Sequence, residues 1–330
     1  MSGDGAVRVA AVDCGTNSLR LLIADVDVAA GELADLGRRM EIVRLGQGVD
    51  ATGRLAPEPL ARTLRALEAY AAAIRRAGAR RVRMVATSAT RDAANASEFV
   101  RGVTAILGVE PEVLSGDEEA RLSFTGATAE LAGPRGAGAQ AGPTRPPGPY
   151  LVVDIGGGST EFVLGSAPDA PPEAALSVDI GCVRMTERHL HSDPPRPAEI
   201  AAATADIDAA LDVVAAKVPV SEARTLIGLA GSVTTVAGIA LGLPRYDPGR
   251  IHHARIPAAG VHRISAGLLA QTRRQRAGIA VMHPGRVDVI GAGALVLDRV
   301  LARFGFAEVI ASEHDILDGI AWSLAASGAP

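Results

Sequence analysis

Several kinds of residue are scarce in this chain of 330 residues, and each shortage excludes a class of protein. Aromatic residues make up only 3% of the sequence, so few rings are available to stack against nucleic-acid bases. The two cysteines, Cys14 and Cys182, are too few for a disulfide framework and lack the spacing of a zinc site. Basic residues number 33 against 37 acidic ones, whereas proteins that bind nucleic acids or membrane surfaces usually carry a basic excess. We therefore expect no nucleic-acid partner and no membrane partner.

Long apolar runs and targeting segments are missing as well. The N-terminal residues include no basic region followed by an apolar one, so no signal peptide is predicted. The uncharged stretch 225–244 contains four glycines and several hydroxyl side chains, whereas a membrane-spanning helix needs about 20 predominantly apolar residues. We interpret this stretch as a buried strand, a Gly-Ser turn and a buried helix. Together with the low cysteine content, these absences predict a cytoplasmic protein.

What is present is a regular alternation of strands and helices. Two strands at 7–13 and 19–26, rich in Val, Leu and Ile, flank the tight turn 14–18, which is the pattern of a β-hairpin. Periodicity and turn residues then predict a strand at 39–45, a helix at 57–78, a strand at 82–86, a helix at 97–108, a strand at 109–114 and a helix at 117–131. This order is that of one half of an α/β protein.

An internal repeat indicates a second, similar half. A shift of 141 positions places residues 12–18 (VDCGTNS) on residues 153–159 (VDIGGGS), and apolar strands flank both copies. Two copies of a strand–Asp–turn–strand pattern suggest two similar lobes that face each other. The second half is predicted to continue with a strand at 176–180, helices at 183–191 and 197–218, a strand at 225–229, a helix to 240, helices at 265–274 and 286–304, a strand at 307–311 and a helix at 315–326. Residues 132–149, nearly all Ala, Gly, Pro and Arg, are expected to form a flexible surface loop.

The second turn, between Asp154 and Glu161, carries the most specific chemistry. The glycines at 156–158 allow close backbone approach, and successive amides directed into one concavity can bind a phosphate. Ser159 adds a hydroxyl donor, and Asp154 at the end of a strand can hold Mg²⁺ directly or through water. A glycine-rich hairpin turn without a ligand is the alternative. The acidic residues at both ends and the second copy of the turn favour a binding site.

The first turn and two later segments offer further polar groups, each with a structural alternative. Thr16 and Asn17 can donate to a phosphate, and Arg20, which stands where the second copy has Glu161, is alternatively a surface strand residue. The acids at 117–119 either stabilise a helix N-terminus or include a general base that faces a phosphate. The hydroxyl residues at 87–90 and the arginine after them follow a strand, where α/β sheets bind ligands, or simply begin a capped helix.

Seven motifs that occur in order resemble a known family. They are VDCGTNSLRLLIADV, MVATSATRDAANASEF, LSGDEEARLSFTGA, LVVDIGGGSTEFVLG, DIGCVRMTERHL, IGLAGSVTTVAGI and HPGRVDVIGAGALVL. Together they resemble the exopolyphosphatase / guanosine pentaphosphate phosphohydrolase (Ppx/GppA) family, within the actin–sugar kinase–Hsp70 superfamily. The resemblance covers essentially the whole chain.

The resemblance implies an α/β fold with two actin-like (ribonuclease H-like) lobes and an interlobe cleft. On this basis, the first lobe is expected at 1–124 with about 311–330, and the second at 125–310. The sequence ends before the C-terminal helical extension of longer family members. We therefore expect shorter polyphosphate chains, rather than long polymers handled processively, as substrates.

The resemblance also implies roles for individual residues. Glu119 corresponds to the catalytic base that activates water, and Arg91 and Glu161 to further catalytic residues. The residues implied in holding Mg²⁺ are Asp154, Asp13 and Glu161, and a monovalent cation such as K⁺ is a second candidate cofactor. The residues implied in substrate binding are Thr16, Asn17, Ser18, Gly156, Gly157, Gly158, Ser159, Gly231 and Ser232.

We therefore predict an exopolyphosphatase, which releases orthophosphate from the end of inorganic polyphosphate. Hydrolysis of guanosine pentaphosphate at its 5′ end is the first alternative. A sensor that binds polyphosphate or a nucleotide without turnover is the second, although a passive anion site gains nothing from carboxylates. A sugar kinase of the same superfamily is the weakest alternative. The sequence leaves the oligomeric state, including a homodimer, open.

Overall fold

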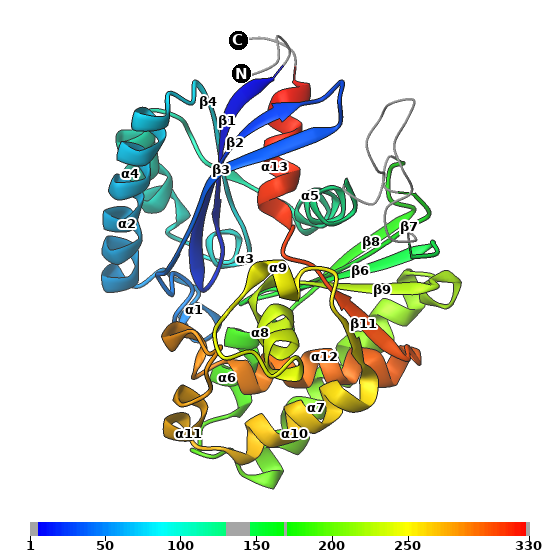
Figure 1. Cartoon of the computed structure of the whole chain (residues 1–330). Helices are drawn as coiled ribbons and strands as arrows, with labels where there is room; N and C mark the ends of the chain where they lie inside the picture. Colours follow the sequence, from blue (N-terminus) through cyan, green and yellow to red (C-terminus); the bar gives the residue numbers. More distant parts are fainter. Residues whose placement is uncertain (1–5, 130–145, 168–169, 328–330) are drawn as a thin grey trace. The chain divides into compact units, whose positions relative to one another are not determined.

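The computed structural model describes residues 6–129, 146–167 and 170–327, and it divides into two compact units (Figure 1). Unit 1 comprises 1–146, 167–171 and 315–330, and unit 2 comprises 147–166 and 172–314. We expected the first lobe to end at residue 124, but that boundary would cut helix α5 (Gly116–Thr128). Unit 1 instead includes the whole helix. The expected return at about 311 lies at the end of strand β11 (Glu308–Ala311), which belongs to the sheet of unit 2. Most of the predicted loop 132–149 lies outside the described residues.

Unit 1 is built on a five-stranded sheet with the order β3-β2-β1-β4-β5. Its strands are β1 (Val7–Cys14), β2 (Ser18–Asp27), β3 (Glu32–Ile42), β4 (Arg81–Ala86) and β5 (Glu112–Val113). The predicted hairpin is confirmed, since β1 and β2 pair antiparallel. Strand β3 begins well before the predicted residue 39, because this edge strand is formed by pairing with β2 while most of its side chains remain exposed. An exposed polar strand carries no apolar alternation that a sequence pattern could reveal.

Alternate side chains of β1 serve two different layers of unit 1. Ala10 and Val12 pack with the helices α2 (Pro57–Ala77) and α4 (Ala96–Leu107), as the two-residue period of a strand requires. Val9 and Ala11 on the opposite face pack against α13 (Ile316–Ala326), the last helix of the chain. Figure 1 shows α2 and α4 on one side of this sheet and α13 with α5 on the other.

Unit 2 repeats this arrangement around a six-stranded sheet with the order β10-β11-β9-β6-β7-β8. Its strands are β6 (Tyr150–Ile155), β7 (Thr160–Gly165), β8 (Ala174–Val178), β9 (Thr225–Leu229), β10 (Arg255–Pro257) and β11 (Glu308–Ala311). The order β8-β7-β6-β9-β11 corresponds to β3-β2-β1-β4-β5 of unit 1. The internal repeat of the sequence is therefore a repeat of topology.

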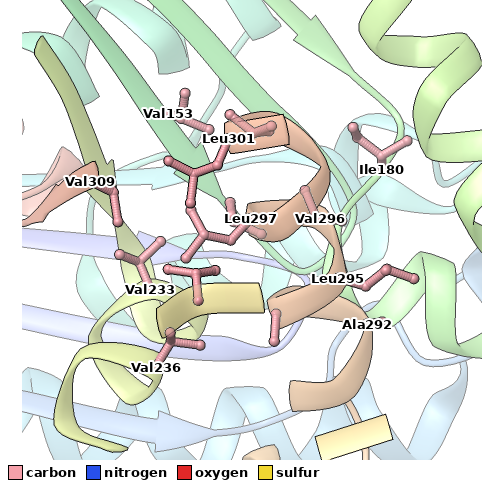
Figure 2. Packing of buried hydrophobic residues seen from close by; sticks show 14 of the residues in the cluster. Val153, Ile180, Val233, Val236, Ala292, Leu295, Val296, Leu297, Leu301 and Val309 are labelled. Atoms are coloured by element: carbon pink, nitrogen blue, oxygen red, sulfur yellow. The ribbon is translucent and has the colours of Figure 1, made fainter. Parts of the chain in front are cut away.

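Helices cover the sheet of unit 2 and bury its main hydrophobic core. They are α6 (Cys182–His189), α7 (Pro197–Lys217), α8 (Ala230–Ala240), α10 (Ala258–Ala270) and α12 (Ile290–Phe304). The short helix α11 (Arg273–Ala277) buries Arg276 and contributes no residue to this core. Figure 2 shows Leu297 and Leu301 of α12 directed toward Val153 of β6 and Val309 of β11. The predicted helix at 265–274 was wrong, since α10 begins seven residues earlier and ends at Ala270. The short helices are α1 (Val49–Thr52), α3 (Ser88–Arg91), α9 (Pro248–Ile251), η2 (Val220–Glu222) and η3 (Pro284–Arg286).

The stretch 225–244 forms strand β9 and helix α8, as predicted, but the expected Gly-Ser turn between them was wrong. Helix α8 begins directly after β9, and Gly231 and Ser232 lie inside it. Among the residues that the structure describes, no helix is both long enough and apolar enough to cross a bilayer.

Candidate active site

Each unit contains one hairpin whose first strand ends in an aspartate, and the cross-strand partner of that aspartate differs. In unit 1, Asp13 pairs in register with Arg20, and in unit 2, Asp154 pairs in register with Glu161. Directly opposed residues of antiparallel strands present their side chains on the same face of the sheet. The first hairpin therefore places opposite charges side by side, and the second places two acids side by side.

The aspartate of unit 1 is neutralised within its own unit. Arg20 donates from Nε and Nη2 to one oxygen of Asp13, over 2.9 and 2.7 Å, and it also forms an ion pair with Asp315. Burial raises the pKa of Asp13, and the positive charge of Arg20 opposes this rise. The side chain of Arg20 is only 18% exposed, so it is not the ordinary surface residue that the sequence left open.

Polar atoms without hydrogen-bond partners surround the turn of unit 1. Thr16 Oγ1, Asn17 Oδ1 and Thr90 Oγ1 are three of the five buried side-chain atoms of this kind among the described residues. Residue 46 supports the turn: its N–H donates to the carbonyl of Thr16, and a Cβ on Gly46 would lie 2.3 Å from the Thr16 methyl group. A buried hydroxyl without a partner costs free energy unless a ligand or water satisfies it, so these atoms mark a place for a polar ligand. Ser18, the third predicted residue here, begins β2.

Glu119 and Arg91 form a pair at the N-terminus of α5. Ser115 caps this helix by accepting a hydrogen bond from the N–H of Glu118, and Glu119 follows in the first turn, with only 8% of its surface exposed. Arg91 Nη1 donates to Glu119 Oε2 over 3.2 Å and to the carbonyl of Leu114 over 3.0 Å. The structure thus brings the predicted base and the predicted arginine into contact, although 28 residues separate them in the sequence.

The two acids of unit 2 are deeply buried. Asp154 is 7% exposed and Glu161 is 1% exposed, and Ser177 of β8 donates to Glu161 Oε1 over 2.7 Å. The alternation of β6 and β7 turns both acids away from the main core, since their neighbours Val153 and Phe162 belong to the hydrophobic cluster. Like charges that lie directly opposite each other are destabilising unless a cation or a shared proton separates them.

This pair of carboxylates fits a metal ion that is shared with a phosphate. Mg²⁺ usually keeps several waters and binds proteins through one or two carboxylates together with substrate phosphates. Within residues 6–129, 146–167 and 170–327, no group of three or more His, Cys, Asp or Glu side chains could hold a metal ion. Asp154 and Glu161 therefore suit a shared Mg²⁺, whereas Asp13 already accepts two hydrogen bonds from Arg20.

The three glycines of unit 2 direct their carbonyl groups toward the start of α6. The carbonyls of Gly156, Gly157 and Gly158 accept from the N–H groups of Cys182, Val183 and Gly181, over 2.9, 2.8 and 3.2 Å respectively. A Cβ at residue 181 would lie 2.3 Å from the carbonyl carbon of Gly157, so only glycine allows this approach. These bonds use amides that would otherwise lack partners at a helix N-terminus.

Gly231 and Ser232 lie in the first turn of α8, against two other segments of unit 2. A Cβ at residue 231 would lie 2.2 Å from the guanidinium carbon of Arg286, so that arginine crosses the start of the helix. Ser232 hydrogen-bonds to Cys182, whose N–H bonds to Gly156. One cysteine thus connects the glycine turn to the start of α8.

Both cysteines are buried, and burial raises the pKa of each thiol, that of Cys14 well above its ordinary value. A buried thiol with a raised pKa is a poor nucleophile. Cys14 therefore suits a small packing residue better than a nucleophile.

Sequence reasoning missed three residues around the second turn, namely Gly181, Arg184 and Ser177. Arg184 Nε donates to the carbonyl of Gly158 over 2.7 Å. Gly181 and Arg184 belong to the motif DIGCVRMTERHL, so their presence there was the available signal. Ser177 had none, because its contact with Glu161 follows from the register of β7 and β8.

Comparisons with known proteins relate almost the whole chain to one family. The model of the Ppx/GppA phosphatase family matches residues 22–327. Exopolyphosphatase 2 of Mycobacterium tuberculosis is 50% identical, and the match covers 96% of this chain and 98% of that protein. A crystal structure of an exopolyphosphatase-like protein superposes with a TM-score of 0.89 at 42% identity, over 97% of this chain and 98% of the other. Guanosine-5′-triphosphate,3′-diphosphate pyrophosphatase of Pseudoalteromonas atlantica is 34% identical, over 70% of this chain and 42% of that protein.

Proposed function

Because this chain belongs to the Ppx/GppA phosphatase family, with its actin-like fold, we propose that it is an exopolyphosphatase that releases orthophosphate from the end of inorganic polyphosphate. The observation that carries the proposal is the pairing of buried Glu119 with Arg91 at the start of α5. The ion pair holds a buried carboxylate in one orientation, which suits a general base that accepts the proton of the attacking water. The identity to an exopolyphosphatase over almost the whole chain supports the substrate class.

In the proposed mechanism, Glu119 orients the attacking water and accepts its proton. Arg91 holds the Glu119 carboxylate in place and stabilises the negative charge that develops on the transferred phosphoryl group. Such positioning and electrostatic effects supply nearly all of the catalysis in phosphoryl transfer. The hydrogen bond between the two side chains keeps the base oriented before the substrate arrives.

The hairpin turns would bind the terminal phosphates of the chain. Amides at 157–159 and the Ser159 hydroxyl donate to phosphate oxygens in unit 2, and the side chains of Thr16, Asn17 and Thr90 do so in unit 1. Asp154 and Glu161 would hold Mg²⁺, which neutralises phosphate charge when it is bound.

Guanosine pentaphosphate is the second candidate substrate, because a guanosine-5′-triphosphate,3′-diphosphate pyrophosphatase is among the relatives. The same residues would act on its 5′-phosphate. A monovalent cation, the cytoplasmic location and a homodimer remain predictions from the sequence. Phosphate release from polyphosphates of several lengths and from guanosine pentaphosphate, each with and without Mg²⁺, ranks the two substrates.

Replacement of the base tests the assignment most directly. We expect Glu119→Gln to fold with an unchanged melting temperature and to lose about 10²–10⁴-fold in kcat, which is the range for loss of a general base. Glu118→Gln is the matched control, because Glu118 is the exposed neighbour in the same helical turn. Full activity of Glu119→Gln, or equal losses in both variants, would remove Glu119 from the mechanism.

A further inference from the structure

The hydrogen bonds between α6 and the glycine turn fix the direction of three peptide groups. In a trans peptide, the carbonyl and the following N–H lie in one plane and point in opposite directions within it. The carbonyls of Gly156, Gly157 and Gly158 all accept from the start of α6. The N–H groups of the next residues, 157, 158 and 159, must therefore point away from α6. The helix thus acts as a template that turns three successive amides outward, as a phosphate-binding turn requires.

One side chain of α6 takes part in this template. Arg184 Nε donates to the carbonyl of Gly158 over 2.7 Å, which is shorter than the 3.2 Å backbone bond from Gly181 to the same oxygen. The Arg184 side chain is only 12% exposed, and its Nη2 lies 3.6 Å from a carboxylate oxygen of Asp179. A charged donor makes a stronger hydrogen bond than a neutral one, so Arg184 is the strongest single restraint on this carbonyl.

The Gly158–Ser159 peptide transmits the effect of this arginine. A cation bound to a carbonyl oxygen polarises the peptide, and hydrogen bonds in such a chain strengthen one another. The Ser159 N–H becomes a better donor as a result, and its direction is fixed. The arginine and an anion at Ser159 would lie at opposite edges of the planar peptide group, so Arg184 need not touch the anion.

We propose that Arg184 is a positioning residue of the phosphate-binding turn, acting on the bound phosphate through the Gly158–Ser159 peptide. The inference rests on the proposed function in one respect. It assumes that the ligand bound in the turn is the terminal phosphate of the substrate or the orthophosphate product. Its consequence is specific. Loss of the guanidinium weakens the binding of phosphate groups and leaves the chemical step, which belongs to Glu119, almost unchanged.

The test compares Arg184→Met with Arg188→Met. Arg188 lies one turn later in α6 and pairs with Asp206 over 2.8 Å, away from the glycine turn, so it is a matched control for the loss of an arginine from this helix. We expect Arg184→Met to raise the KM for polyphosphate and the dissociation constant of orthophosphate, measured by calorimetry with Mg²⁺, by about tenfold each. The kcat should stay within about twofold of wild type, and Arg188→Met should match wild type.

A merely structural role predicts the opposite pattern. Partial misfolding would lower kcat and leave KM and the dissociation constant unchanged, and that result would overturn the proposal. If Arg184→Met does not fold, Arg184→Lys decides, because its flexible ammonium keeps the charge but not the planar donor, so both constants should rise by about threefold. Wild-type constants in every folded variant would also overturn it. A wild-type protein that releases no phosphate from polyphosphate would contradict the proposed function, while the orthophosphate constants would still decide the role of Arg184.

Discussion

The two hairpins of this protein share a backbone pattern but treat their aspartates in opposite ways. In the β1–β2 hairpin, Arg20 lies opposite Asp13 and neutralises it. In the β6–β7 hairpin, Glu161 occupies the position that corresponds to Arg20 and lies opposite Asp154. It therefore adds a second negative charge instead of neutralising the first. The first turn offers side-chain hydroxyls and an amide, and the second offers backbone amides oriented by α6. One copy of the repeat is thus closed by its own ion pair, whereas the other is suited to an external cation.

Removal of the second acid should have the largest effect. We expect Glu161→Gln to lower kcat at saturating polyphosphate by at least about 100-fold and to raise the Mg²⁺ concentration needed for half-maximal activity. The reason is that an amide cannot balance the charge of a divalent cation. Ser177→Ala is the control, because it removes only the hydroxyl that donates to Glu161 and leaves the carboxylate. If the activity of Glu161→Gln depended on the Mg²⁺ concentration as wild type does, the second hairpin would not be the one that holds the metal ion.

Removal of the arginine from the first hairpin should reduce stability. We expect Arg20→Met to lower the free energy of unfolding by about 3 kcal/mol, because it leaves the buried Asp13 and Asp315 without their shared cation. Arg8→Met is the matched control on the same hairpin, since the Arg8–Asp25 pair is more exposed and should contribute less than about 1 kcal/mol. Urea denaturation measures both. Equal losses would show that Arg20 contributes no more than a surface ion pair.

The same variant should change how stability depends on pH. The pKa of Asp13 is already raised by burial, and without Arg20 it should rise further. A carboxyl whose pKa is higher in the folded state than in the unfolded state, where it is about 3.9, binds protons more tightly when folded. The stability of Arg20→Met relative to wild type should therefore fall as the pH rises from about 4 to 7. A difference between the two proteins that stays constant over this range would contradict the raised pKa.

Substitutions of hydroxyl side chains in the two turns and in α3 should separate side-chain recognition from backbone recognition. We expect Thr16→Val and Thr90→Val to raise the KM for polyphosphate about three- to tenfold each, because each removes one buried hydroxyl without a partner in the protein. Ser159→Ala should have a smaller effect, since the backbone N–H at this position remains. If Ser159→Ala raised KM more than either threonine variant did, the second turn would also depend on a side chain, and the proposed difference between the two turns would be wrong.

The smallest effect concerns the two cysteines, Cys14 at the end of β1 and Cys182 at the start of α6. Burial raises the pKa of both Cys14 and Cys182, so neither thiol should react measurably with an aromatic disulfide reagent at pH 8 until the protein unfolds. Cys14→Ala should retain wild-type kcat within about twofold. Rapid reaction of either thiol in the folded protein would show that its surroundings are more open than the structure indicates.

Local patterns in the sequence predicted the parts of the fold that have local causes. The hairpins follow from apolar strands around short turns, and the repeat at a spacing of 141 predicted the common topology of the two sheets. The polar strand β3 was placed too late, because pairing with β2 alone stabilises it. Helix α10 was misplaced because its N-terminal half carries little apolar periodicity, with several exposed small or polar residues.

The candidate site was predictable where motifs carry it and not where long-range contacts do. Glu119 and Arg91 were both named from motifs, and the structure places them 3.2 Å apart. The partner of Arg20, Asp315, lies 295 positions later, and no local pattern connects the two. The role of Arg184 depends on which carbonyl its side chain reaches, and this follows only from the fold of unit 2.

The division of the chain also has a consequence for the order in which the protein is made. Helix α13 packs against β1 in the core of unit 1, and its Gly319 approaches α5 so closely that a Cβ would lie 2.0 Å from the carbonyl oxygen of Leu122. Most of unit 2 is a single continuous stretch, 172–314, that the ribosome finishes before α13 is synthesised. Unit 1, although its first strands emerge earliest, must wait with one apolar face of its sheet uncovered until the last helix arrives.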